Sequence, residues 1–385
     1  MDNKKLKGIE QFIRATFNTK APIGLHEPKF IGREKEYLNQ CIDSTFVSYV
    51  GEFVGKFEQS LSEFTGSKYV VATANGTLAL HLALLVAGVE AGDEVLTQGL
   101  SFVATANSIA YCKANIVFLD VDRETFGLSY VILKDFLEKN AEVKNGICYN
   151  KNSKNKIKAC VPVHVFGHPI SALDKMAKLC REFHIKLIED AAESLGSFYK
   201  NKHTGTFGDL ATLSFNGNKI VTTGGGGAVL TNDQNIYEKV KHLSTTAKVP
   251  HRWEFFHDQV GYNYRMPNVN AAVGLAQMEC LPSFLQDKRE LTEKYATFFR
   301  DLGICFFTEK EDVRSNYWLN SLILEDKAER DQMLTFLNDL GIMCRPIWQP
   351  LYTLPAFKEA KHGSSLENVA LLADRVVNIP SSVRI

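Results

Sequence analysis

Between about residues 56 and 250, short apolar segments typical of β-strands alternate with segments typical of helices. Strands that are apolar throughout and separated by helices form a mainly parallel sheet with both faces covered. In such sheets, ligands bind at the carboxyl ends of the strands. We therefore expect an α/β fold, with its chemistry in the loops that follow the strands. The expected strands are KYVVATA (68–74), DEVLTQ (93–98), NIVFLDV (115–121), ACVPVHVFG (159–167), IKLIEDA (185–191), ATLSFN (211–216) and GAVLTN (227–232).

The chain beyond residue 266 has a different pattern. Residues 267–302 predict two long helices broken near Pro282, and residues 303–385 predict a small α+β domain with a strand near 317–323 and a helix near 327–339. A chain of 385 residues exceeds the ~100 to 200 residues of a typical domain. We expect four parts, namely an N-terminal segment (1–50), a large domain (51–265), connecting helices (266–302) and a small C-terminal domain (303–385).

The overall charge argues against polyanionic partners. The 44 basic side chains balance the 44 acidic ones, so no bulk field attracts nucleic acid or an anionic membrane. No segment has the run of about 18 apolar residues that a membrane span needs, and the first residues lack the apolar stretch of a signal peptide. The eight cysteines lie far apart without a CxxC pair, which fits neither a disulfide framework nor a zinc site. We expect a cytoplasmic protein with no nucleic-acid or membrane partner and no metal.

One stretch, SFNGNKIVTTGGGGAVLTN, places a single lysine, Lys219, before four consecutive glycines. A Walker loop needs glycine before the lysine and a hydroxyl residue after it, but Asn218 and Ile220 stand there. A dinucleotide fingerprint starting at Gly224 needs glycine at position 229, which is Val229, and a helix after the run. Two interpretations remain: a glycine-rich turn with an incidental lysine, or a loop that presents a reactive amine.

Three other strand ends favour the reactive amine. Asp190 closes an apolar strand, where a buried carboxylate needs a cationic partner. Gly76 and Thr77 lie where a strand runs into a helix, so their amides suit a phosphate group. Phe102 lies at the next strand-to-helix junction. With Lys219, these are the parts that pyridoxal phosphate (PLP) requires: an amine for the Schiff base, a carboxylate for the pyridine nitrogen, a phosphate site and an aromatic ring for stacking.

The ordered motifs NGT, SFVATANS, EDAAESLGS, SFNGNK, GGGGA and GYNYRMPN resemble the DegT/DnrJ/EryC1/StrS family of PLP-dependent sugar aminotransferases across nearly the whole chain. The resemblance implies the PLP-dependent transferase type I (aspartate aminotransferase) fold. This fold has a large domain with a central, mainly parallel sheet and a small C-terminal α+β domain. It also implies a homodimer whose active sites lie at the subunit interface.

The resemblance assigns roles by position. Lys219 would carry the cofactor as a Schiff base and move the proton, and Asp190 would pair with the pyridine nitrogen. Ser214 would bind the phosphate alongside Gly76 and Thr77.

Two further positions come from the same motifs. Asn263 of GYNYR would reach the phosphate of the neighbouring subunit's cofactor. Glu193 occupies a cofactor-binding position where many relatives have His or Gln. A related branch of dehydratases has histidine in place of the lysine, so Lys219 argues against that branch.

The N-terminal segment is similar to a subgroup that aminates 4-keto-6-deoxy-N-acetylglucosamine nucleotides, with L-glutamate as the amino donor, on routes to legionaminic acid and bacillosamine. That similarity makes Thr45, Phe46, Val47 and Ser48 candidate substrate contacts. Three more candidates are Arg265, Arg345 and Trp348, since arginines suit the two phosphates of a UDP-sugar and aromatic rings suit its base. For Trp348 a place in the core of the small domain is an equal alternative, and Arg265 could instead form a structural ion pair at the subunit interface.

Several alternatives stay open from the sequence. The sugar carrier could be UDP, GDP or dTDP, amination could be at C4 or C3, and the fold could serve a regulatory protein that binds PLP or a sugar nucleotide without catalysis. His164 and His168 have the spacing of a metal pair on a helix, but the segment is typical of a strand end and loop, which favours packing histidines. The aromatic-rich residues 251–264 could stack on bases, but on a neutral protein they favour a dimer interface near the active site.

Overall fold

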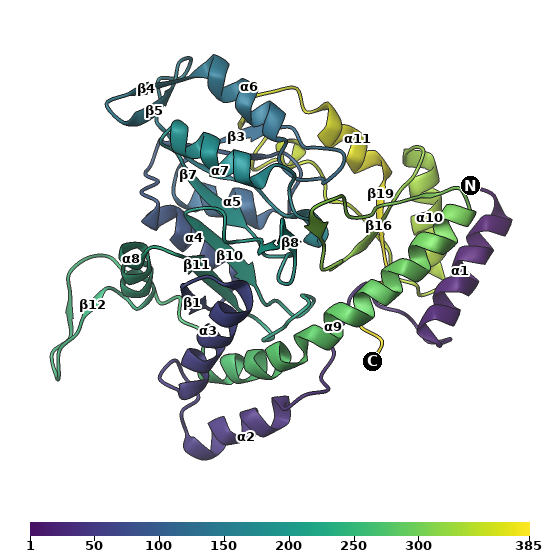
Figure 1. Cartoon of the computed structure of the whole chain (residues 1–385), viewed down its shortest axis with the longest axis horizontal. Helices are drawn as coiled ribbons and strands as arrows, with labels where there is room; N and C mark the ends of the chain where they lie inside the picture. The colour runs from purple at the N-terminus through teal and green to yellow at the C-terminus, as the bar shows by residue number, and fades with distance from the viewer.

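The computed structural model describes all 385 residues, and its centre is one eight-stranded sheet (Figure 1). Strand β11 is antiparallel to both of its neighbours, and the other strand pairs are parallel. The expected α/β fold with a mainly parallel sheet is therefore confirmed. In spatial order the strands are β1 (Tyr69–Thr73), β11 (Gly227–Thr231), β10 (Leu210–Ser214), β7 (Lys186–Asp190), β6 (Ile157–Val161), β2 (Glu94–Gln98), β3 (Asn115–Leu119) and β18 (Lys361–His362).

Both faces of this sheet are buried, because successive strand residues point to opposite sides. Val71 packs with helices α4 (Gly76–Val86), α5 (Ala104–Tyr111) and α8 (Gln234–Ser244) on one face. Val70 packs on the other face with α2 (Glu34–Ser44), α3 (Glu52–Thr65) and the first half of α9 (Asn268–Asp301), and further along the same sheet Leu96 packs with α6 (Tyr130–Asn140) and α7 (Leu173–Glu182). This double cover leaves the strand ends as the place for a ligand.

The prediction of two helices broken at Pro282 is wrong, because α9 is one helix of 34 residues with Pro282 inside it. A proline in a helix interior loses one hydrogen bond and costs roughly 3 kcal/mol. Packing on both sides of the proline outweighs that cost. Ala272 and Ala276 lie in the core beneath α3, while Tyr295 and Phe299 lie in a second core with α1 (Asn3–Phe17). In Figure 1, α9 accordingly runs from beside α3 to beside α1.

A smaller body surrounds the second half of α9. It contains a four-stranded sheet, in the order β14 (Cys305–Phe306), β16 (Asn320–Ile323), β19 (Val376–Ile379) and β17 (Arg345–Pro346). The helix expected near 327–339 is α10 (Lys327–Asp339), and α11 (Glu367–Arg375) follows it. Strand β18 also comes from the last part of the chain but pairs with β3 of the large sheet. The domain boundaries proposed from the sequence stay predictions.

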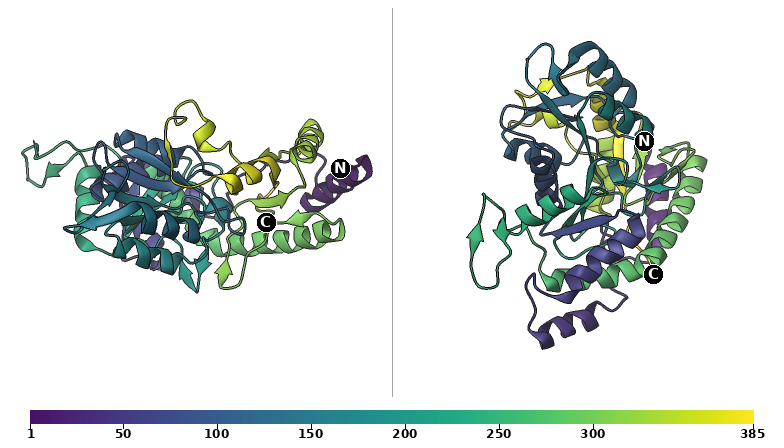
Figure 2. Two further views of the ribbon diagram at one scale, coloured as in Figure 1. Left: turned by 90° about the horizontal axis from the view of Figure 1, so that it is seen from above. Right: turned by 60° about the vertical axis from the view of Figure 1, so that its left-hand side comes forward.

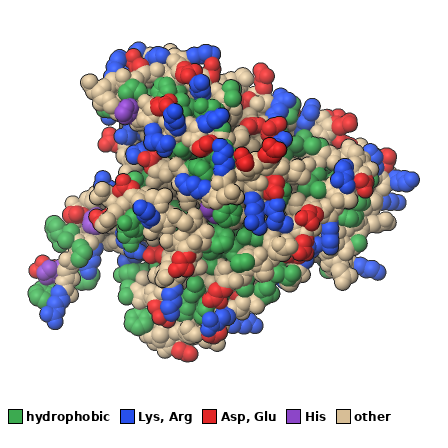
Figure 3. All heavy atoms as spheres, in the orientation of Figure 1, with side chains coloured by type: hydrophobic (Ala, Val, Ile, Leu, Met, Phe, Trp, Pro, Cys, Tyr) green, Lys and Arg blue, Asp and Glu red, His purple; other side chains and the backbone are tan.

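Short hairpins decorate the surface. They are formed by β4 (Ala141–Lys144) with β5 (Ile147–Asn150), by β8 (Phe198–Tyr199) with β9 (Lys202–His203) and the added strand β15 (Val313–Arg314), and by β12 (Lys248–Val249) with β13 (Phe256–His257). The β12–β13 hairpin projects away from the rest of the chain, and apolar side chains gather on it (Figures 2 and 3). Trp253 is 69% exposed and Phe255 is 79% exposed. None of the helices has both the length and the apolar character that crossing a membrane requires.

Candidate active site

A cavity of about 330 Å³ lies where five strands of the large sheet end. Strands β1, β2, β6, β7 and β10 all point their carboxyl ends toward this edge, because β1 and β10 are both antiparallel to the β11 strand between them. The cavity gathers eight of the side chains or backbone positions proposed from the sequence. They are Gly76, Thr77, Phe102, Asp190, Glu193, Ser214, Lys219 and Trp348.

Lys219 lies in the turn that follows β10, and its side chain is 13% exposed, inside the cavity. Its amide donates to the carbonyl of Asn216 at 2.9 Å, which closes the turn. The amine Nζ lies 3.1 Å from Oε1 of Glu193 and 3.6 Å from the ring centroid of Trp318. The amine is thus presented to an enclosed space, as a residue that forms a Schiff base must be.

Asp190 is the last residue of β7 and is only 5% exposed. Its Oδ2 accepts a hydrogen bond from the Thr105 hydroxyl at 2.8 Å, and its Oδ1 accepts one from the Ala192 amide at 3.2 Å. Burial raises the pKa of this carboxyl, against the opposing effect of the Thr105 hydroxyl. No lysine or arginine forms a salt bridge with it. A buried carboxylate of this kind suits a protonated ring nitrogen of a ligand.

The start of α4 also lines the cavity and offers donors for an anion. Asn75 caps the helix through a hydrogen bond from the Leu78 amide at 2.9 Å, and the amides of Gly76 and Thr77 have no acceptor. Ser214 lies so close that a Cβ at Gly76 would be 3.1 Å from its Oγ. Two free amides, a helix N-terminus and a hydroxyl are the donors that a phosphate group requires.

The glycine run after Lys219 ends beside the start of α4. Gly227, the last of the four glycines and the first residue of β11, lies directly against the peptide group that joins Asn75 to Gly76. A Cβ at Gly227 would lie 2.6 Å from the Gly76 nitrogen, a distance that the backbone does not allow. The absence of a side chain at Gly227 therefore permits close packing of β11 against the helix start.

Glu193 is buried between the Lys219 loop and the loop after β6. Its Oε1 lies against the Lys219 amine, and its Oε2 accepts from the Phe166 amide at 2.8 Å. Burial raises the pKa of the Glu193 carboxyl, and the Lys219 amine opposes that rise. Two carboxyls, those of Asp190 and Glu193, thus face one lysine inside a single cavity.

The two histidines considered for a metal have packing roles. His164 contacts the buried Glu189 through Nε2 at 3.1 Å, and His168 packs edge-on against Phe307 and Tyr317. Burial alone would raise the pKa of Glu189, but His164 and the backbone amides hold it below its ordinary value. Burial lowers the pKa of His168 to about 3, so its ring is neutral. The prediction of packing histidines is confirmed.

The remaining predicted residues lie outside the cavity wall. Residues 45–48 are exposed after α2, where the Asn268 side chain donates to the Phe46 carbonyl at 2.6 Å. Arg265 lies over the Tyr49 ring, 3.5 Å from its centroid, and donates to Oδ1 of Asn263 at 2.8 Å.

Arg345 is exposed on β17 and does not line the cavity. Arg265 forms no ion pair within the chain, and the alternative of an ion pair at the subunit interface stays a prediction. Trp348 lines the cavity and also packs on Phe166, at 4.8 Å between ring centroids.

Sequence reasoning missed Trp318 and Thr105. Trp318 reaches the cavity from the segment just before β16, more than 90 residues from Lys219, so no local spacing indicates the contact. Thr105 stands in the motif SFVATANS, and its hydroxyl is placed on Asp190 only by the packing of α5 beside β7.

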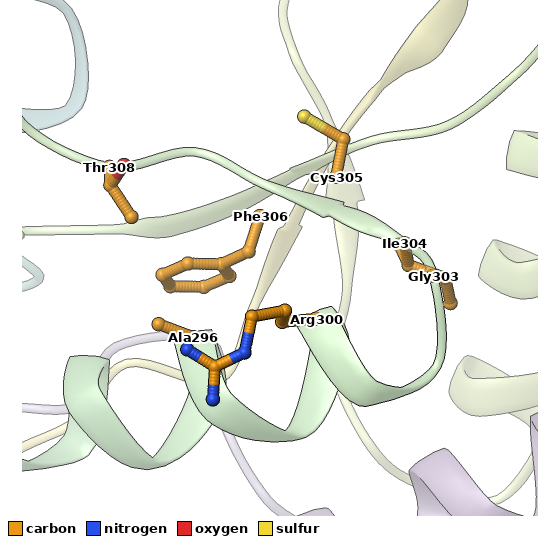
Figure 4. A pocket seen from close by; sticks show the side chains of 7 residues that line it. All are labelled: Ala296, Arg300, Gly303, Ile304, Cys305, Phe306 and Thr308. Carbon is orange, nitrogen blue, oxygen red and sulfur yellow. The ribbon is translucent and has the colours of Figure 1, made fainter.

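A second hollow, drawn in Figure 4, lies between the end of α9 and β14. Arg300 is the one charged residue of its lining, which otherwise includes Phe306 and Thr308. The lining of this hollow contains no carboxylate, no histidine and no helix N-terminus. The cavity at the strand ends, by contrast, combines an amine, two buried carboxyls and a helix N-terminus.

The cavity fits PLP by the nature of its donors: an enclosed amine, a buried carboxylate without a cation, and free amides at a helix start. A type I α/β fold with this set of groups defines a PLP-dependent transferase. The model of the DegT/DnrJ/EryC1/StrS aminotransferase family matches residues 28–385. The chain belongs to this family, and its cofactor is pyridoxal 5′-phosphate.

Individual relatives agree with the family. The chain is 38% identical over 361 residues to GDP-perosamine synthase of Escherichia coli O157:H7, covering 93% of both chains. It is 29% identical over 334 residues to UDP-4-amino-4,6-dideoxy-N-acetyl-beta-L-altrosamine transaminase of Campylobacter jejuni, covering 86% of this chain and 85% of the relative. Among solved structures, the aminotransferase TlmJ of Streptoalloteichus hindustanus is 27% identical, with a TM-score of 0.84 and 94% of each chain covered.

Proposed function

We propose that this chain transfers an amino group from L-glutamate to the keto carbon of a 4-keto-6-deoxy sugar carried by a nucleoside diphosphate. The observation that supports this most is the joint placement of Lys219, Asp190 and the α4 start around one cavity. The names of the relatives, which include a GDP-sugar and a UDP-sugar enzyme, support a nucleotide-sugar substrate.

Several residues of the cavity have a defined task in this proposal. When bound, the cofactor supplies an electron sink that stabilises negative charge next to the reacting amine. Asp190 keeps the ring nitrogen protonated, and the α4 amides with Ser214 hold the phosphate. Lys219 is the base and acid that moves the proton at the reacting carbon, because it is the one amine in the cavity. Phe102 stacks on the ring.

For the carrier we propose UDP, with amination at C4 of a 4-keto-6-deoxy-N-acetylhexosamine. The resemblance of the N-terminal segment to the bacillosamine and legionaminic acid subgroup supports this choice. A second candidate is a GDP-linked 4-keto-6-deoxy sugar, which is supported by the 38% identity to GDP-perosamine synthase. In both cases Trp348 is a candidate for contact with the sugar nucleotide, since it lines the cavity.

We further propose a homodimer in which each subunit completes the other's site. Asn263, Arg265 and residues 45–48 lie outside their own cavity, and apolar side chains around them are exposed, with Phe46 at 57% and Val50 at 60%. Exposed apolar patches of this kind are typical of interfaces between subunits. In the dimer Asn263 reaches the partner's cofactor phosphate, and the aromatic β12–β13 hairpin packs on the partner.

The substrate is tested by mixing the enzyme with L-glutamate and each of three 4-keto-6-deoxy nucleotide sugars, linked to UDP, GDP or dTDP. Nuclear magnetic resonance of the product identifies the aminated carbon and its configuration. We expect a 4-amino product from one carrier at a much higher kcat/KM than from the others. Turnover of none of the three, with glutamate still donating its amino group, would reject the sugar substrate but not the aminotransferase.

The shared site is tested by mixing two inactive variants, Lys219→Ala and Asn263→Ala, under conditions that exchange subunits. In a mixed dimer one site receives both substitutions and the other receives none. Activity should recover to about a quarter of the wild-type value, since half of the dimers are mixed and each has one intact site. Absence of recovery after proven exchange would place Asn263 in its own subunit's site, and full activity of Asn263→Ala alone would place it outside any site.

A further inference from the structure

The Lys219 amine has two neighbours that both favour its charged form. On one side the Glu193 carboxylate accepts from Nζ at 3.1 Å. On the other side Nζ lies over the Trp318 ring, 3.6 Å from the ring centroid. The face of an indole attracts an ammonium group, and the attraction is stronger in an enclosed site than at the surface. Trp318 is 5% exposed, so the contact is largely shielded from water.

Trp318 is held at every polar atom it has. Its indole Nε1 donates to the carbonyl of Asn218, the residue before Lys219, at 2.7 Å. Its backbone amide donates to Oδ1 of Asn316 at 2.8 Å. Its carbonyl accepts from the fully buried amine of Lys288 at 3.2 Å. These three bonds fix the ring relative to the Lys219 loop.

The frame around Trp318 is also connected to Glu193. The Asn316 side chain donates to the carbonyl of Glu193 at 2.9 Å, and Phe166 binds the Glu193 carboxylate through its amide. Tyr317, directly before Trp318, has a φ of 48°, which is rare for a bulky residue and persists only where the surroundings impose it. The same network therefore positions both neighbours of the amine.

Two other basic side chains, Lys288 and His26, lie near Trp318 but do not take the place of the Lys219 amine over its ring. Burial lowers the pKa of Lys288 to about 7 and lowers the pKa of His26 well below its ordinary value. His26 packs 6.4 Å from Trp318 between ring centroids, and neither of its nitrogens has a hydrogen-bond partner. Asp190 faces the same cavity but makes its hydrogen bonds to Thr105 and Ala192.

We propose that Trp318 and Glu193 together hold the Lys219 ammonium whenever this amine is not bonded to the cofactor, which makes Trp318 a positioning residue. The inference rests on the proposed role of Lys219. A lysine side chain is flexible and loses much rotamer freedom when it is fixed. The contacts keep the released amine charged and next to the reacting carbon, so that it can return its proton there.

The test uses the full chain freed of cofactor, in the wild-type form and as Trp318→Leu, Trp318→Phe and Glu193→Gln. Carbamylation by cyanate is followed at Lys219 by peptide mass spectrometry over a range of pH. Since cyanate reacts with the neutral amine, loss of the indole face should raise the rate at neutral pH by about 2- to 30-fold in Trp318→Leu. The midpoint of the pH profile should move down by about 0.4 to 1.5 units, which is the same change on a logarithmic scale.

A matched control separates this effect from access to the cavity. Trp348→Leu opens the same cavity without touching the amine, so its midpoint should equal that of the wild type. Greater access alone raises the rate equally at every pH and leaves the midpoint unchanged. Trp318→Phe keeps a weaker ring face and should fall between the wild type and Trp318→Leu, and Glu193→Gln should move the midpoint in the same direction.

Wild-type midpoints in Trp318→Phe and Glu193→Gln would overturn the inference, even if Trp318→Leu fails to fold. An equal shift in Trp348→Leu would do the same. Attachment of the cofactor to another lysine would instead reject the proposed role of Lys219, so the two failures are distinguishable.

Discussion

Replacing Asp190 by asparagine should separate catalysis from stability. Asparagine has nearly the same shape and can keep both contacts, with Oδ1 accepting from the Ala192 amide and Nδ2 donating to the Thr105 hydroxyl. Only the charge is lost. A buried opposite charge in direct contact shifts a pKa by about 2 to 3 units, or about 3 to 4 kcal/mol, so the protonated form of the cofactor ring should lose that stabilisation.

We therefore expect Asp190→Asn to lower the rate of the glutamate half-reaction by about 100- to 1000-fold, measured by stopped-flow absorbance in a single turnover. The stability of the cofactor-free protein should not fall. Burial raises the pKa of Asp190 in that state, so the ionised carboxylate destabilises the folded chain once the pH exceeds the ordinary carboxyl range. Urea unfolding near neutral pH should give a free energy at least equal to that of the wild type.

Thr105→Val is the control for Asp190→Asn, because it removes one hydrogen bond and keeps the charge. It should cost the half-reaction only about 10-fold. A rate for Asp190→Asn within threefold of the wild type would refute the pairing of Asp190 with the ring nitrogen. A large loss of unfolding free energy in cofactor-free Asp190→Asn would show that this substitution removes more than the charge.

Three further predictions concern the phosphate site, α9 and the buried histidines. Ser214→Ala should weaken cofactor binding by about 10- to 100-fold, because one hydrogen bond to a charged group is lost, and equilibrium dialysis would measure this; unchanged binding would remove Ser214 from the site. Pro282→Ala should raise the free energy of unfolding by about 1 to 3 kcal/mol, because α9 is continuous there; a loss of stability would mean that the helix requires the proline. Burial lowers the pKa of His168 to about 3 and of His203 to about 4, so the unfolded chain binds more protons below the ordinary value of 6.5. The folded chain should therefore lose about 1.4 kcal/mol of unfolding free energy per pH unit for each histidine as the pH falls below 6.5. His168→Gln should reduce this dependence of the unfolding free energy on pH, measured by urea unfolding from pH 6.5 to 4.5.

The sheet and its strand ends were predictable from the sequence because their signals are local. One apolar strand ends in Asp190, and another runs through Asn75 into a helix. In each case the local sequence shows that the residue lies at the edge of the sheet. Parallel strands then bring these ends together, and the cavity contains every cofactor residue proposed except Asn263.

Contacts between distant segments were not predictable in this way. Trp318 reaches Lys219 from the smaller body, and Lys288 reaches Trp318 from the middle of α9. Neither contact has a local pattern. The error at Pro282 has the same origin, since the local rule for proline is correct but packing at both ends of α9 outweighs it. Residues 45–48 and Asn263 lie outside the cavity of their own chain, and the proposed homodimer would bring them to the partner's site.

The proposed function requires that Lys219 carries the cofactor. Reduction of the cofactor-bound protein with borohydride makes the lysine–cofactor bond permanent, and peptide mass mapping then identifies the lysine. We expect a phosphopyridoxyl group on the peptide that contains Lys219, and its absence from Lys219→Ala. A phosphopyridoxyl group on a different lysine, or on none, would show that Lys219 does not carry the cofactor.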